Sequence, residues 1–168
     1  RYVLCIPNEE VQQEFRDLTA SYLNVSESSL SAMFNGLRYE ERERFAQSYA
    51  DMLQSLPSYH DLKDEHSYHV LFLGMCAWLS NEYEIKSNWE AGKGRCDIIL
   101  KAKKERLPSY VLEFKSLKEA DEKELEASAR AAIDQIKARR YDIELAGKVI
   151  LVGLAHAGKE VRIAWQER

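Results

Sequence analysis

The sequence predicts an α/β (α+β) fold in which helices flank a central mixed sheet, preceded by a small helical segment. Apolar residues recur at helical spacing through the first third of the chain. Three strand-like segments follow, and a long amphipathic helix then precedes two more strands. The predicted order from residue 59 onward is α-β-β-β-α-β-β. We expect residues 1–58 to form a helical linker or appendage and residues 59–168 to form the main domain.

The helical segment is expected to begin after a short strand at the N-terminus. Asn8 can cap a first helix, because a short polar side chain before Glu9 and Glu10 satisfies free backbone N–H groups. Further helices are expected over residues 27–34 and 39–56. Pro57 ends the last of these, since a proline disfavours helical geometry at the residue before it.

The main domain is expected to begin with a strongly apolar helix over residues 65–83. Short apolar runs bounded by turn residues predict five strands, over residues 83–87, 95–102, 108–114, 148–155 and 160–165. The second and third strands form a hairpin through a turn at 103–106. Apolar residues repeat every three or four positions between residues 122 and 140, which predicts the long helix.

Composition indicates a globular protein of a reducing compartment. The chain is 45% hydrophobic and 31% charged, and its three cysteines, Cys5, Cys76 and Cys96, are far apart. The longest apolar run, residues 70–79, is about half of what a membrane span needs, and the N-terminus lacks the pattern of a signal peptide. We expect a cytoplasmic protein with no membrane partner. Because the sequence opens without Met, we also expect it to be the C-terminal piece of a longer protein.

Charge is unevenly distributed along the chain. The net charge of −4 counts against a simple nucleic-acid binder, yet residues 86–106 carry seven basic and three acidic residues, a net +4. Lys86, Lys93 and Arg95 lie in this segment. Lys93 and Arg95, beside two glycines, belong either to a phosphate-binding surface or to an ordinary surface hairpin, and the sequence leaves both open.

Two patterns that suggest chemistry are expected to have structural roles. GLAHAGKE, residues 153–160, fails the phosphate-binding loop pattern at its last position, where Glu160 replaces Ser or Thr, and it predicts a hairpin turn. His66 and His69 are three apart on a helix and could share a metal. Glu65 precedes both histidines and no Cys lies nearby, so we expect His69 to lie near the core instead.

Charged residues interrupt two apolar strands in the centre of the main domain. Glu113 and Lys115 are two apart in YVLEFKS, so they point to the same face, and Asp97 begins the apolar run of the preceding strand. Two carboxylates from paired strands can bind one Mg²⁺ or Mn²⁺, and a lysine beside them can act on an attacking water. The alternatives are an ion pair at an exposed sheet edge for Glu113 and Lys115, and a turn residue for Asp97.

The constellation resembles the signature of the PD-(D/E)XK nuclease superfamily, in which an Asp on the second strand precedes a (D/E)XK motif on the third. Fifteen residues separate Asp97 from Glu113-Phe114-Lys115, and the predicted order matches the αβββαβ core of that superfamily. The resemblance implies a restriction-endonuclease-like fold and a metal-dependent phosphodiesterase. Asp97 and Glu113 would bind the metal, and Lys115 would be the catalytic lysine.

The likeness extends to a narrower family, the nuclease domain at the C-terminus of predicted bacterial AAA-ATPase-like proteins. This likeness rests on Tyr68-His69, KSNWEAGKGRCDIILK, VLEFK, Gln135-Ile136-Lys137 and Tyr141. In addition, IPNEEV and the helices after it resemble the linker that follows the ATPase module. This resemblance implies an N-terminal ATPase module as a partner in the full-length protein.

Further roles are implied by the resemblance alone. Glu65 resembles the acidic residue that many members add to the metal site, often through water. Gln135 resembles the helix glutamine that touches substrate or orients the lysine, although a solvated helix residue is the alternative. Cys96 stands where the family has proline. Tyr141 lies farther from Gln135 than in RecB-type members, which leaves its role open.

We therefore expect a Mg²⁺- or Mn²⁺-dependent nuclease acting on nucleic acid, with DNA as the expected substrate. Its nucleic-acid contacts are expected from Lys86, Lys93, Arg95 and Tyr141. The alternative is a catalytically silent nuclease-like fold that binds nucleic acid or a partner within a larger ATPase protein. The oligomeric state is open, although a cut in both strands would need two active sites.

Overall fold

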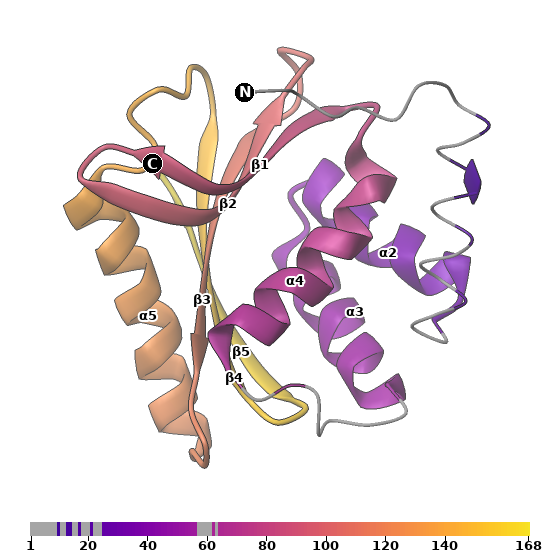
Figure 1. The fold of residues 1–168 in the computed structure, drawn as a ribbon, viewed down its shortest axis with the longest axis vertical. Helices are drawn as coiled ribbons and strands as arrows, with labels where there is room; N and C mark the ends of the chain where they lie inside the picture. Colours follow the sequence, from indigo (N-terminus) through magenta and orange to yellow (C-terminus); the bar gives the residue numbers. More distant parts are fainter. Residues whose placement is uncertain are drawn as a thin grey trace.

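Figure 1 shows the computed structural model of the chain, which describes residues 25–56, 62 and 64–168, together with residues 10, 13, 14, 17 and 21. The predicted N-terminal strand and most of the first predicted helix lie outside the described residues. None of the helices in the described part is both long enough and apolar enough to span a membrane.

The centre of the fold is a five-stranded mixed sheet, as predicted. Its strands are β1 (Tyr83–Ala91), β2 (Gly94–Ala102), β3 (Ser109–Ser116), β4 (Val149–Ala157) and β5 (Glu160–Glu167). They lie in the order β1-β2-β3-β4-β5, with β3 and β4 parallel and every other neighbouring pair antiparallel. Strand β1 extends to Ala91, beyond the predicted end at residue 87, because it pairs with β2 down to Gly94.

Helix α5 (Glu122–Arg139) lies on one face of the sheet (Figure 1). Asp121 and Glu124 form a reciprocal capping box at its start, and Arg140 ends it in the left-handed region at φ 58°. One side of α5 buries Leu125, Ala129, Ala132, Ile133 and Ile136. Gly153 of β4 permits the close approach, since a Cβ there would lie 2.0 Å from the carbonyl oxygen of Ala129.

The other face of the sheet carries α2 (Glu27–Arg38), α3 (Arg42–Ser55) and α4 (Glu65–Met75) (Figure 1). Helix α4 is shorter than predicted, because residues 76–79 form a 3₁₀ turn whose Trp78 carbonyl accepts a hydrogen bond from Arg38. One apolar core joins these helices to the sheet, including Phe45 of α3 and Phe114 of β3. The division at residue 58 stays a prediction.

Strands β3 and β4 are buried along almost their whole length because helices cover both faces of the sheet. The buried polar and charged residues of these two strands are therefore held in an apolar layer. They are Ser109 and Glu113 of β3 and His156 of β4, at 4%, 3% and 0% exposed, whereas Lys115 near the end of β3 is only partly buried.

Candidate active site

The site lies at a fork in the sheet, the point where β2 and β3 separate. The two strands pair from Leu100 opposite Tyr110 to Ile98 opposite Leu112, and β2 then continues with β1 alone. Asp97 is the first β2 residue beyond the last pair. Its Oδ2 accepts a hydrogen bond of 2.9 Å from the backbone N–H of Phe114. The carboxylate thus replaces a strand partner, and this contact fixes it beside β3.

Glu113 is the buried carboxylate of the site. Its Oε1 accepts a hydrogen bond from Nε2 of Gln135 and lies 3.5 Å from Nζ of Lys115. Its Oε2 is buried and has no hydrogen-bond partner in the described part of the chain. Burial raises the pKa of Glu113 to about 7, the negative charge of Asp97 adds to the rise, and Lys115 opposes it. The predicted role of these two carboxylates as ligands of one metal ion stays a prediction.

Lys115 links the sheet to helix α4. Its Nζ lies 3.5 Å from Oε1 of Glu113 and 3.8 Å from Oε2 of Glu65, the first residue of α4. Glu65 is half exposed and is the lysine's second anionic partner. Its role at a metal stays a prediction, because the structure places it against the ammonium group.

A buried polar chain supports the backbone of Lys115. Nδ1 of His156 lies 3.3 Å from the Lys115 carbonyl oxygen, and Nε2 of His156 lies 3.0 Å from the hydroxyl of Tyr49 on α3. If Nδ1–H donates to the carbonyl, Nε2 must accept from the tyrosine. The ring of His156 also stacks on Tyr68, with centroids 4.0 Å apart. Burial lowers the pKa of His156 to about 3, so the ring is neutral at ordinary pH.

Tyr49 and His156 were not predicted as site residues. His156 could have been singled out as the one histidine within the apolar run of a core strand. Tyr49 carried no such signal, because an aromatic residue at helical spacing is ordinary core material.

Gln135 reaches the site from the C-terminal third of α5, and Tyr141 follows the end of this helix. Burial raises the pKa of the Tyr141 hydroxyl, and its hydrogen bond with Gln135 opposes the rise. Tyr141 is 3% exposed, and a Cβ on Gly94 would lie 3.1 Å from its hydroxyl oxygen. The predicted contact of Tyr141 with nucleic acid finds no support in this position, since little of the ring is open to a ligand.

His69 lies near the core, as predicted. It is 3% exposed, and its Nε2 lies 2.9 Å from Oγ of Ser87 on β1. Burial lowers the pKa of His69, while the charge of Asp97 raises it, so its ring lies near the fork. The described residues contain no group of three or more His, Cys, Asp or Glu side chains arranged to hold a metal.

Residues 153–160, the segment that resembles a phosphate-binding loop, also have the expected structure. Ala157 pairs with Glu160 across β4 and β5, and Gly158 occupies the turn between them at φ 59°. The segment is thus a hairpin turn, and no helix follows it.

Asp97 and Glu113 have the donor set that Mg²⁺ or Mn²⁺ would require. Magnesium binds one or two protein carboxylates and keeps water or phosphate oxygens as its remaining ligands. The unpartnered Oε2 of Glu113 fits this reading, because a buried carboxylate oxygen without a donor is costly unless a cation offsets its charge. The two residues therefore fit a divalent metal.

The three basic residues that were predicted to contact nucleic acid differ in whether other protein groups already engage their side chains. Lys86 places its Nζ 4.2 Å from the ring centre of Trp89 and 3.9 Å from Glu84, which leaves its side chain 17% exposed. Lys93 and Arg95 are exposed at the turn between β1 and β2. These two side chains are thus available to a ligand, whereas Lys86 is already engaged.

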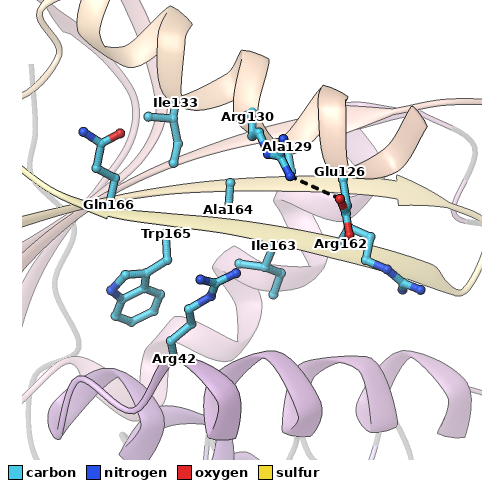
Figure 2. Close-up of a pocket in the computed structure, with 10 residues that line it drawn as sticks. All are labelled: Arg42, Glu126, Ala129, Arg130, Ile133, Arg162, Ile163, Ala164, Trp165 and Gln166. Carbon is cyan, nitrogen blue, oxygen red and sulfur yellow. Dashed lines mark hydrogen bonds and ion pairs between the residues drawn. The ribbon is translucent and has the colours of Figure 1, made fainter. Parts of the chain in front are cut away.

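A separate cavity of about 380 Å³ lies at the far edge of the sheet, between α5, β5 and the start of α3 (Figure 2). Its lining includes Arg42, Arg130, Arg162 and Trp165. Asp97, Glu113 and Lys115 do not line it. Arg130 and Arg162 are paired with Glu126 and Glu122 there, so part of its charge is already neutralised.

Comparison with known protein families bears out the class that this fold and site define. Residues 63–166 match the model of the PD-(D/E)XK nuclease superfamily. The match spans well over half of the chain, and the protein belongs to this superfamily. A search of curated proteins found no match.

Proposed function

We propose that the protein is a metal-dependent nuclease that hydrolyses phosphodiester bonds, with DNA as the expected substrate. The observation that supports this most is Glu113, a buried carboxylate with an unpartnered oxygen beside Asp97 and Lys115. A purely structural role would leave that oxygen at a cost in stability with nothing gained.

Asp97 and Glu113 would hold Mg²⁺ or Mn²⁺, which when bound supplies charge stabilisation for the phosphate and a more acidic water. Asp97 is oriented by the Phe114 N–H and Glu113 by the Gln135 amide, so neither carboxylate has to reorganise. Lys115 carries its ammonium 3.5 Å from Oε1 of Glu113. It can orient the attacking water and donate a proton to the leaving oxygen as the P–O bond to that oxygen breaks, while the attacking water, which forms the new P–O bond, gives up its proton to solvent.

The sequence resemblance also supports a setting for the activity. We propose that the chain acts as the nuclease module of a larger protein with an N-terminal ATPase module. The competing proposal, a silent fold that only binds nucleic acid, differs in one respect: it predicts binding with no turnover in any divalent metal.

The deciding experiment is a cleavage assay with supercoiled plasmid, single-stranded DNA and RNA, in Mg²⁺ or Mn²⁺ and in EDTA. We expect metal-dependent cleavage by the wild type and a loss of about 100-fold or more in Lys115→Ala. Lys118→Ala removes an exposed lysine three residues away and is the matched control. Equal activity in the two variants, or cleavage that persists in EDTA, contradicts the proposal.

A further inference from the structure

Two segments far apart in the sequence form one cationic surface beside the candidate active site. We propose that Lys93 and Arg95 of the β1–β2 hairpin, together with Arg139 and Arg140 at the end of α5, bind the phosphate backbone of the substrate. The inference rests on the proposed nuclease function and adds a binding surface to it. Arg139 and Arg140 were not predicted to contact nucleic acid.

Two hydrogen bonds hold the β1–β2 hairpin against the end of α5. The N–H of Lys93 donates to the Arg139 carbonyl at 2.7 Å, and Nη1 of Arg139 donates back to the Lys93 carbonyl at 3.1 Å. Gly92 makes this approach feasible. It has φ 56°, and a Cβ there would lie 2.0 Å from the Arg139 carbonyl oxygen. The four cationic residues thus belong to one rigid unit.

The four charges are available to a ligand. All four residues are exposed, and none of them forms an ion pair with a described residue. Other arginines of the described part are already paired with acidic side chains: Arg38, Arg44, Arg130, Arg162 and Arg168.

Two carboxylates reduce the positive charge of this surface. Glu90 and Glu144 line an open hollow together with Arg95, Gly92 and Gly94. Four cations against two carboxylates still leave the surface positive, on a chain whose net charge is −4. A polyanion therefore meets a positive local field at this surface.

Both segments lead directly to the candidate active site. Arg95 precedes Asp97 by two residues on β2, a spacing of about 7 Å along a strand. Arg139 follows Gln135 by four residues on α5, about 6 Å along the same side of the helix. A phosphodiester chain held at this surface would pass into the space beside Glu113.

The surface offers charge and no platform for stacking bases. Tyr141, the aromatic residue beneath it, is 3% exposed. Trp89 on the same hairpin is half-buried, and the ammonium of Lys86 lies over its ring. Exposed cations with covered aromatic rings favour contacts to phosphates over contacts to bases. Binding should therefore depend steeply on salt and little on sequence.

The test is the affinity of the full chain for two labelled DNA duplexes of equal length and different sequence, measured by fluorescence anisotropy. Calcium replaces magnesium, and the salt concentration is varied from 50 to 200 mM. We expect Arg139→Gln/Arg140→Gln to weaken binding to both duplexes by about tenfold or more. The slope of log affinity against log salt should flatten by about two units, since each lost phosphate contact releases about one fewer counterion.

The control variant is Arg42→Gln/Arg106→Gln, which removes two exposed arginines that also lack an ion pair and lie away from the hairpin. It should bind as the wild type does. Arg139→Lys/Arg140→Lys keeps the charge and should retain most of the affinity. An unchanged affinity and salt slope in the Gln variant, an equal loss in the control, or no binding by the wild type overturns the proposed surface.

Cleavage by the wild type in Mg²⁺ is measured in parallel, so the two proposals fail separately. Cleavage with unaltered binding by the Gln variant would reject the surface and leave the nuclease function standing. Binding that depends on Arg139 and Arg140 without any cleavage would support the surface and reject the nuclease function.

Discussion

The side-chain amide of Gln135 donates a hydrogen bond to Oε1 of Glu113, which joins the C-terminal third of α5 to β3. This contact orients a buried carboxylate whose other oxygen has no partner in the described part of the chain. It also makes α5 part of the site, because any movement of the helix along the sheet would move the donor.

Glu113→Gln should stabilise the metal-free protein at high pH. Native Glu113 keeps its proton up to about pH 7, whereas an unfolded chain releases it near 4.5. The native state therefore holds more protons in that window, and its stability falls as the pH rises through it. The variant carries no such charge, so we expect it to be more stable by about 1–3 kcal/mol at pH 8.

Urea denaturation in EDTA at pH 4 and pH 8 measures this difference. At pH 4 the two proteins should have similar unfolding free energies, because Glu113 is neutral in both states. A gap of equal size at both pH values would show that ionisation of Glu113 is not its cause.

Gln135→Ala should shift the pH dependence of activity. Without the amide donor, the ionised form of Glu113 loses a hydrogen bond, and its pKa should rise further above the ordinary range. We expect the acid limb of the rate profile to move to higher pH, with a partial recovery of the rate above pH 8. Asp134→Asn changes the exposed neighbouring residue and is the control. A uniform loss of rate at every pH would argue against this role of Gln135.

Two substitutions at Asp97 should separate its structural contact from its charge. Asp97→Asn keeps an oxygen that can accept from the Phe114 N–H, so its stability should stay near that of the wild type. Asp97→Ala leaves that N–H without its partner and should cost about 1–3 kcal/mol. Both should lose metal-dependent activity. Equal unfolding free energies of the two variants would show that the contact contributes little.

Tyr49→Phe should affect Lys115 through His156. The substitution removes the donor to Nε2 of a fully buried imidazole, which costs about 1–3 kcal/mol in stability. We expect kcat to fall more than KM changes, because the backbone of Lys115, the proposed catalytic lysine, is displaced and the proposed substrate surface is not. Phe45→Leu perturbs the same helix without touching His156 and is the control for loss of packing. Equal effects of the two substitutions on kcat would show that the hydrogen bonds of Tyr49 and His156 do not position Lys115.

The strands and the charged fork could be predicted because their signals are local. Glu113 and Lys115 interrupt an apolar strand, and alternation along a strand fixes which side chains share a face. Asp97 could be predicted as a site residue because it begins the apolar run of the neighbouring strand. A place for Gln135 in the site was expected only from resemblance, and its contact with Glu113 was not predicted, since helical periodicity fixes a face and not a contact 22 residues away.

Long-range contacts account for what the sequence did not reveal. The bond between Tyr49 and His156 joins residues 107 positions apart, and each residue alone resembles core material. The joining of Arg139 to the hairpin depends on Gly92 meeting the end of α5. The end of α4 was placed too late, because an apolar run does not distinguish an α-helix from the 3₁₀ turn that continues it.

The proposed nuclease function requires that Asp97 and Glu113 share one divalent cation. The most direct measurement is anomalous diffraction from crystals of the wild type and of Glu113→Gln soaked in Mn²⁺. We expect one manganese peak between the two carboxylates in the wild type, bound by Oε2 of Glu113, and no such peak in the variant. A wild-type crystal with manganese at other sites and none at this fork would contradict it.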